Sequence, residues 1–400
     1  MSSGVKRRSD RTLKVLFLIR SLNYGGAERQ LVLLARGLSQ RGHDVAVALF
    51  YSGGPLEKDL REAGVRIRPL YKGGRWDTIG FLFRLTQVVR EEWPGVLHSY
   101  LWGANLMTAF LKPLFPTIKI VWGVRNSVMD FSRYDWLSKL TFKVTCWLSR
   151  FPDAIILNSY AGRDYHLSLG YPAEKSVVIP NGIDTERFRP DPAVRNRIRQ
   201  EWRVNEEDKL IGLVGRLDPM KDHAVFLEAA SLLVKEREHL RFVCVGDGPD
   251  DYRTRLRTVA KDLQLEDRLL WVGNRKDMPA VYNALDIGIS SSAYGEGISN
   301  VIGEAMACGV PYVVTDVGDS AWVVGDTGKV VPPQDSVALK NAIVSLLDHT
   351  PQSPSQIRLR ITERLSVAAL IQNTERILGQ VACMSGTSTH LQLFGAPRDL

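Results

Sequence analysis

Residues 287–315, IGISSSAYGEGISNVIGEAMACGVPYVVT, decide the fold class of this chain. An apolar run at 287–292 is followed by a glycine turn, a segment with helical periodicity at 300–308 and a second apolar run at 311–315. Short apolar runs that alternate with helical segments are typical of parallel strands buried on both faces. The stretch therefore predicts an α/β fold with a parallel sheet.

The same alternation extends over the rest of the chain. The first half opens with an apolar run at 13–19, a glycine turn at Gly25 and Gly26, a helical segment and another apolar run at 45–50. The second half repeats the pattern from residue 209 onward. We therefore predict two Rossmann-like, doubly wound α/β domains facing an interdomain cleft, because such sheets bind ligands at the carboxyl ends of their strands.

Length and local composition set the expected domain boundaries. The 400 residues, 44% of them hydrophobic, are enough to bury two cores, and the segment NGIDTERFRPDP interrupts the alternation with turn-forming residues. We predict a Rossmann-like N-terminal domain over 1–185, a linker region over 186–206, a Rossmann-like C-terminal domain over 207–357, a helix over 358–380 that can cross back to the N-terminal domain, and a disordered tail over 381–400.

The charge balance is basic, with 52 Lys and Arg against 44 Asp and Glu and a net charge of +8. This favours anionic partners such as nucleotides or phospholipid surfaces, although scattered surface charge is the alternative. No recognised nucleic-acid-binding module is present, so we expect no nucleic acid partner. The four cysteines show no C-x-x-C pair, which fits a reduced, cytoplasmic protein without a metal site.

Residues 131–150, FSRYDWLSKLTFKVTCWLSR, combine apolar and basic side chains as does a helix lying on an anionic bilayer. The apolar members are Trp136, Leu140, Phe142 and Trp147, and the basic members are Arg133, Lys139, Lys143 and Arg150. An ordinary packed helix with one solvated face is the alternative. No run reaches the roughly 18 uncharged apolar residues that span a bilayer, so membrane contact would be peripheral, on the cytoplasmic face.

Glu296 and Glu304 stand on either side of an expected helix start. Gly297 and the cap residues Ser299 and Asn300 place Glu296 before the helix and Glu304 in its first two turns. Backbone N–H groups at a helix start suit a phosphate or a sugar hydroxyl. Eight residues of helix rise about 12 Å, too far for the paired carboxyl groups of a glycosidase. The alternative is simple stabilisation of acidic side chains near a helix N-terminus.

Arg216 and Lys221 place two cations in GRLDPMKD, the loop after the first apolar run of the second half. A guanidinium and an ammonium beside backbone donors can clamp a diphosphate. No D-x-D pair occurs in the chain, so these cations can replace a metal ion in neutralising a leaving diphosphate. A solvated basic turn is the alternative.

Several motifs occur together in the order and spacing of glycosyltransferase family 4, which the chain resembles. They are GGAERQL at 25–31, VIPNGIDTERFRP at 178–190, GRLDPMKDH at 215–223, VGDGP at 245–249 and SSAYGEGISNVIGEAMACGVPYVVTDVG at 291–318. The resemblance, from about residue 13 to 333, implies the GT-B fold and a retaining, metal-independent glycosyltransferase without a cofactor. It would move a sugar from a nucleotide diphosphate sugar to a saccharide or lipid-linked saccharide in polysaccharide or glycolipid synthesis.

By matching position, the resemblance also implies residue roles, with acceptor binding in the N-terminal domain and donor binding in the C-terminal domain. Glu304 would bind the ribose, Glu296 the transferred sugar, and Arg216 with Lys221 the diphosphate. The implied donor-binding set is Gly26, Arg216, Lys221, Glu296, Gly297, Ile298, Ser299, Asn300 and Glu304. The implied catalytic set is Glu296, Arg216, Lys221 and His98, and the acceptor-binding set is Gly25, Gly26 and Tyr100. In the family's front-face mechanism the departing phosphate oxygen takes the acceptor proton.

Two positions depart from the family pattern. Many relatives carry His-x-His where this chain has His98-Ser99-Tyr100, and the second histidine often lies by the transferred sugar. Tyr100 can donate a hydrogen bond but does not titrate near neutral pH. Whether His98 or Tyr100 takes that role stays open, as does a purely structural His98. Trp322 stands where a glutamate is frequent, so it either reshapes a binding pocket or simply packs.

Other functions fit less well. The alternatives on the same fold are a nucleotide-sugar epimerase and a non-catalytic nucleotide-sugar-binding protein, and the combined motifs favour transfer over both. A nicotinamide dehydrogenase is disfavoured because VGDGPDD at 245–251 lacks the full G-x-G-x-x-G pattern. The sequence does not specify the donor sugar, the nucleotide base, the acceptor, the linkage or the oligomeric state.

Overall fold

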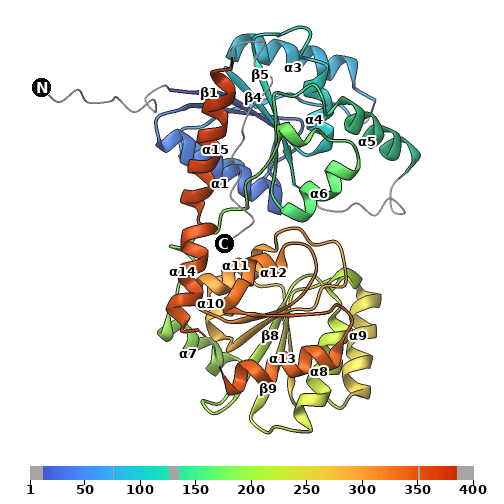
Figure 1. Cartoon of the computed structure of the whole chain (residues 1–400), viewed down its shortest axis with the longest axis vertical. Helices are drawn as coiled ribbons and strands as arrows, with labels where there is room; N and C mark the ends of the chain where they lie inside the picture. Colours follow the sequence, from blue (N-terminus) through green and yellow to red (C-terminus); the bar gives the residue numbers. More distant parts are fainter. Residues whose placement is uncertain (1–11, 75, 126–134, 350–351, 385–400) are drawn as a thin grey trace, which may run out of the picture.

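The computed structural model describes residues 12–74, 76–125, 135–349 and 352–384. Within them the chain forms two α/β domains, drawn one above the other in Figure 1 with the N-terminal domain at the top. Each domain is built on one parallel sheet with helices on both faces. The predicted fold class, two Rossmann-like doubly wound domains, is confirmed.

The N-terminal sheet has seven strands in the order β3-β2-β1-β4-β5-β6-β7. These are β1 (Lys14–Ile19), β2 (Asp44–Leu49), β3 (Arg66–Pro69), β4 (Val96–Tyr100), β5 (Lys119–Val124), β6 (Ala154–Leu157) and β7 (Ser176–Val178). The helices of this domain are α1 (Gly26–Gln40), α2 (Glu57–Glu62), α3 (Ile79–Glu92), α4 (Trp102–Ala109), α5 (Trp136–Leu148) and α6 (Tyr160–Ser168). The strand order reverses direction between β1 and β4, which is where such sheets bind ligands.

The C-terminal sheet has six strands in the order β10-β9-β8-β11-β12-β13. These are β8 (Lys209–Val214), β9 (Leu240–Val245), β10 (Leu269–Gly273), β11 (Ile287–Ser290), β12 (Tyr312–Thr315) and β13 (Lys329–Val331). Its helical segments are α7 (Pro192–Glu201), η3 (Pro219–Lys221), α8 (His223–Val234), α9 (Asp250–Asp262), α10 (Met278–Ala284), α11 (Asn300–Ala307), α12 (Ser320–Val324), η4 (Gly325–Thr327) and α13 (Ser336–Asp348). The reversal here lies between β8 and β11.

Strand β1 shows why the sequence forms buried parallel strands. Its alternate side chains Val15, Phe17 and Ile19 join the core under α1, whereas Leu16 and Leu18 pack with α3 on the other face. Both sets are essentially inaccessible to solvent. A strand covered on both faces needs a continuous apolar run, and this is what residues 13–19 supply.

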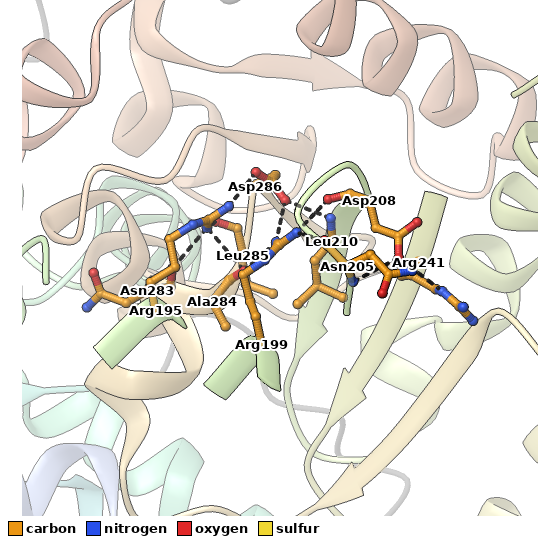
Figure 2. A network of polar contacts seen from close by, with 10 residues as sticks. All are labelled: Arg195, Arg199, Asn205, Asp208, Leu210, Arg241, Asn283, Ala284, Leu285 and Asp286. Carbon is orange, nitrogen blue, oxygen red and sulfur yellow. Dashed lines mark hydrogen bonds and ion pairs between the residues drawn. The ribbon is translucent and has the colours of Figure 1, made fainter. Parts of the chain in front are cut away.

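The predicted linker over residues 186–206 is wrong, because most of it belongs to the C-terminal domain. Helix α7 packs against α10, and its side chains Arg195 and Arg199 bond to Asp286 at 2.8 and 2.9 Å, as Figure 2 shows. The chain instead crosses between the domains at residues 179–183, since Ile179 lies in the N-terminal core and Ile183 in the C-terminal core. The charges of α7 imitate a solvated linker, but two of them are satisfied inside the domain.

The predicted helix over residues 358–380 is two helices. Helix α14 (Pro354–Arg364) packs on α11 in the C-terminal domain, and α15 (Val367–Ala382) packs on α1 in the N-terminal domain. Ser366 starts the second helix by accepting a hydrogen bond from the backbone of Ala369. Figure 1 shows the pair running along one side of both domains. The C-terminal domain therefore extends past residue 357, and of the predicted tail only 381–384 lies within the described residues.

Candidate active site

The loops after β8 and β11 bring Lys221 and Glu296 together. Lys221 ends the short helix η3, and its ammonium pairs with Oε1 of Glu296. The hydroxyl of Ser292 donates a second hydrogen bond to the same oxygen at 2.7 Å. The Lys221 and Glu296 side chains are only 15% and 9% exposed, so their charges act on each other with little screening. The two residues predicted to hold the diphosphate and the sugar are neighbours at the carboxyl edge of the sheet.

Glu304 lies one helical turn into α11 and accepts a hydrogen bond from the hydroxyl of Tyr282 at 2.8 Å. Burial raises the pKa of Glu304, while the Tyr282 hydrogen bond and the charges of Arg29 and Arg187 lower it. Arg29 belongs to α1 of the other domain. Its charge reaches Glu304 across the domain boundary, so this carboxylate faces the N-terminal domain.

The start of α11 links these two glutamates. Ser299 is the residue before the helix, but its side chain makes no cap hydrogen bond. Asn300 uses its side-chain oxygen to accept a 2.9 Å hydrogen bond from Asn181 in the interdomain crossing. Ile298 is buried in the C-terminal core, which anchors the loop. The helix start therefore keeps backbone donors that its own N-cap side chain does not use, as a phosphate or sugar site requires.

The remaining donor and acceptor residues of the prediction lie on loops. Arg216 is exposed just after β8. Gly26 begins α1, and a Cβ added there would meet nothing within 4 Å, whereas one added at Gly25 would meet the Glu28 carboxyl group at 2.1 Å. Gly26 thus faces open space, and at Gly25 an added Cβ would displace only the mobile end of the Glu28 side chain.

The interdomain crossing places the starts of α1 and α11 on the same boundary. Gly182 exchanges two hydrogen bonds with the side chain of Gln30 in α1, at 2.7 and 2.9 Å. The preceding residue, Asn181, bonds to Asn300 of α11. The carboxyl ends of both sheets therefore meet at this boundary. Among the described residues, no group of three or more His, Cys, Asp or Glu side chains is placed to hold a metal ion.

His98 and Tyr100 are buried in the N-terminal domain, and the Tyr100 hydroxyl is connected to the boundary through Arg125. Both side chains are fully buried, with ring centroids 4.9 Å apart and the His98 ring 5.4 Å from that of Phe17. Nδ1 of His98 lies 3.1 Å from the carbonyl of Val121, and burial lowers its pKa to about 3. A catalytic His98 and an acceptor-binding Tyr100 are therefore not supported, because neither ring is accessible to a ligand in this structure.

Apart from Trp322, for which packing was one of the two predicted roles, the following residues at the boundary have no counterpart in the sequence prediction. Arg125 donates to the Tyr100 hydroxyl at 2.7 Å and to Asn181 at 3.4 Å. Asp319 binds the start of α6, and Trp322 packs on Tyr160 with ring centroids 5.4 Å apart. Arg29 could have been found, because it follows the glycine pair in the quoted motif. The others depend on contacts between segments far apart in sequence.

Two doubly wound domains whose binding edges meet at one boundary, with paired charges around the start of α11, are the architecture of the GT-B type. Two family models match it: one described as Glycosyltransferase Family 4 covers residues 24–187, and one described as Glycosyl transferases group 1 covers residues 208–349. The chain belongs to glycosyltransferase family 4, within the group 1 glycosyltransferases.

Two curated relatives illustrate the similarity. The lipopolysaccharide core biosynthesis mannosyltransferase LpsB of Rhizobium meliloti is 31% identical over 213 residues, which are 52% of this chain and 58% of the relative. The GDP-mannose-dependent alpha-(1-6)-phosphatidylinositol monomannoside mannosyltransferase of Mycobacterium tuberculosis is 30% identical over 201 residues, 48% of this chain and 51% of the relative. The chain thus spans little more than half the length of these relatives.

A solved structure covers more of the chain. The Anabaena protein HepE, determined in complex with UDP, superimposes with a TM-score of 0.81 at 24% identity, over 92% of this chain and all of HepE. This likeness establishes the GT-B arrangement of the two domains.

Proposed function

We propose that the protein is a retaining glycosyltransferase that moves a sugar from a nucleotide diphosphate sugar to a saccharide or lipid-linked saccharide. The observation that carries the proposal is the cluster at α11, where Lys221 pairs with Glu296 on one side of the helix start and Tyr282 with Glu304 on the other. Two carboxylates and one ammonium group can together hold one extended ligand: one carboxylate binds the sugar, the ammonium group binds the diphosphate, and the other carboxylate binds the nucleoside. The named relatives are transferases, which favours transfer over epimerisation.

Each residue of the cluster has a task in this proposal. Arg216 and Lys221 hold the diphosphate, since a guanidinium and an ammonium match its charge. Glu296 binds hydroxyls of the transferred sugar, and Glu304 binds the ribose. Lys221 can turn from Glu296 toward the diphosphate when the donor enters. These cations neutralise the leaving group, so the proposal assigns no metal ion.

The proposed chemistry is a single exchange of bonds at the anomeric carbon. The bond from that carbon to the diphosphate oxygen breaks, and a bond to the acceptor oxygen forms on the same face. The departing phosphate oxygen takes the proton of the acceptor hydroxyl, which gives a glycoside and a nucleoside diphosphate. Lys221 and Arg216 stabilise the charge that develops on the phosphate in the transition state.

Nucleotide binding tests the proposal most directly. Calorimetry of the purified chain with UDP-, GDP-, ADP- and dTDP-sugars should show selective binding to one nucleotide. Glu304→Ala and Lys221→Ala should each weaken that binding at least tenfold, because each removes a charged partner. Lys235→Ala, at an exposed lysine beyond α8, is the matched control and should bind as the wild type does. Absence of binding to all four classes would contradict the proposal.

A peripheral membrane contact through α5 is a second part of the proposal. Trp136, Leu140 and Trp147 are 73%, 49% and 60% exposed on α5. Of these, Trp147 lines an open cavity of about 810 Å³ together with Lys139, Lys143 and Arg150. Exposed aromatic and basic side chains in one patch complement an anionic bilayer, and we place the contact on the cytoplasmic face. No described helix is both long and apolar enough to traverse a bilayer.

One predicted member of this patch, Phe142, is not exposed, and another cannot be placed. Phe142 is only 3% exposed, although it lines the cavity with Lys139 and Lys143. The exposed apolar stripe of α5 includes Trp136, Leu140 and Val144. Arg133 lies outside the described residues. Phe142 therefore adds almost no exposed apolar area to the predicted contact surface.

Vesicle sedimentation tests the membrane contact. The chain should bind phosphatidylglycerol vesicles at low salt and not phosphatidylcholine vesicles. Lys139→Glu with Lys143→Glu should reduce this binding at least tenfold, since each basic residue near an anionic surface contributes about 1 kcal/mol. The control reverses two exposed lysines of the other domain, Lys235 and Lys261. Equal losses in both double variants would show that net charge, and not α5, drives binding.

A further inference from the structure

Asp319 lies at the start of two helices from different domains. It is the residue before α12 in the C-terminal domain, and its carboxylate accepts hydrogen bonds from the backbone N–H groups of Tyr160 and Ala161 at 2.6 and 2.8 Å. Those groups begin α6 of the N-terminal domain, whose third N–H is capped by Ser159 at 3.0 Å. A carboxylate at a helix N-terminus is electrostatically favourable, and Asp319 is only 3% exposed.

The same residue is attached to the loop that carries Glu296. The backbone N–H of Asp319 donates to the carbonyl of Gly297 at 3.1 Å. Its neighbour Gly318 has φ +61°, and a Cβ there would lie 2.3 Å from the carbonyl oxygen of Glu296. The turn at 318–319 is thus pressed onto residues 296–297. Asp319 thus contacts both the start of α6 and this loop.

Two further contacts stiffen the connection. The ring of Trp322 in α12 packs on that of Tyr160 in α6. Arg360 of α14 donates to the carbonyl oxygens of Trp322 and Val323 at 2.6 and 2.8 Å, which fixes α12 to its own domain. Figure 1 shows α12 at the edge of the C-terminal domain and α6 at the facing edge of the N-terminal domain. Trp322, which replaces the frequent glutamate, packs between the domains.

We infer that Asp319 is a positioning residue: it sets the orientation of the donor loop 296–300 according to the position of α6, and so aligns the donor sugar with the acceptor-binding domain. The inference rests on the proposed transfer function. Asp319 contacts the donor loop and not the expected nucleotide pocket at Glu304. A variant of Asp319 can therefore keep its affinity for the nucleotide while the donor sugar loses its alignment with the acceptor. Misalignment lowers the rate of the chemical step more than it lowers affinity.

Hydrogen exchange and donor hydrolysis test this together. The variants are Asp319→Ala, the shape-conserving Asp319→Asn, and the control Asp316→Ala, at an exposed carboxylate of the same turn. In Asp319→Ala, amide exchange should rise at least tenfold both at 160–162 and at 296–300. The kcat for hydrolysis of UDP-glucose or GDP-mannose should fall tenfold or more, while Kd values for UDP and GDP change less than threefold. Asp319→Asn should be intermediate, and Asp316→Ala unchanged.

Faster exchange at 160–162 alone, with exchange at 296–300 and kcat as in the wild type, would overturn the inference and leave Asp319 as a helix cap. A rise in Kd that matches the fall in kcat/KM, at constant kcat, would also overturn it, because the residue would then serve binding. If the wild type binds none of the four nucleotide classes, UDP, GDP, ADP and dTDP, the proposed function fails instead. The exchange result still decides whether the two segments are coupled, since it requires no nucleotide.

Discussion

The two sheets reverse their strand order at equivalent places, yet the chain uses these places in opposite ways. At the reversal between β8 and β11, the following loops carry Arg216, Lys221 and Glu296 to the domain boundary. At the reversal between β1 and β4, the polar residues His98 and Tyr100 turn into a packed cluster of rings. The sheet topology offers a binding edge in both domains, but only the loops and helix starts decide whether polar side chains face a ligand or the core.

Of the substitutions that test this difference between the two sheets, removal of the Lys221 ammonium group should lower kcat the most. Lys221→Met is expected to lower the kcat for donor hydrolysis roughly 10²–10³-fold, the cost of losing one preorganised group that stabilises transition-state charge. Steady-state release of nucleoside diphosphate measures this, and Lys235→Met controls for loss of a surface charge. A kcat within threefold of the wild type would show that Lys221 only neutralises Glu296.

Tyr282→Phe should have an intermediate effect. The variant loses the hydrogen bond that the phenol donates to Glu304, and this bond counteracts the rise in the pKa of Glu304 caused by burial. Without it the pKa rises further, so the carboxylate becomes protonated at a higher pH. Affinity for the nucleoside diphosphate should fall about tenfold, with a larger loss at pH 6 than at pH 8. Calorimetry at both pH values checks this, and a pH-independent loss would exclude a titrating Glu304 as the cause.

The sequence predicts features that depend on local spacing and misses those that depend on long-range packing. Glu296 and Glu304 flank one helix start, so their distance along the chain already fixes their placement. Asp319 contacts Tyr160 across 159 positions of sequence, and no local pattern indicates that contact. The charges of α7 predict a linker, because the partner of Arg199, Asp286, lies 87 positions further along the chain.

The burial of His98 was equally invisible in the sequence. The prediction of a catalytic His98 rests on the resemblance to relatives with His-x-His. Whether a ligand can reach His98 depends on what covers its ring, namely Phe17 from β1 and Gly123 from β5. The ring of Phe17 lies 5.4 Å from that of His98, and a Cβ added at Gly123 would lie 3.3 Å from the His98 ring. These neighbours come from separate strands. A pattern within β4 describes the alternation of the strand and not what covers it.

Replacing His98 should have the smallest effect on activity and a distinct effect on stability. His98→Phe keeps a ring in the cluster, so kcat should stay within threefold of the wild type. The His98 pKa is about 3 in the folded chain, against an ordinary value of 6.5. The unfolded chain therefore binds the extra proton between those values, and the wild type loses about 1.4 kcal/mol of unfolding free energy per pH unit below 6.5. His98→Phe has no titrating group at this position, so its unfolding free energy does not fall for this reason.

Guanidinium unfolding of both proteins at pH 5, 6 and 7.5 measures the difference. Because the folded-state pKa is depressed, the contribution of His98 is constant above pH 6.5 and declines as the pH falls, so the variant should gain on the wild type by about 2 kcal/mol between pH 7.5 and 5. The proposed difference between the two sheets would be wrong if His98→Phe lowered kcat a hundredfold and left the pH dependence of the unfolding free energy as in the wild type. It would mean that the β4 edge opens to ligand during turnover and that both sheets contribute titratable groups to the reaction.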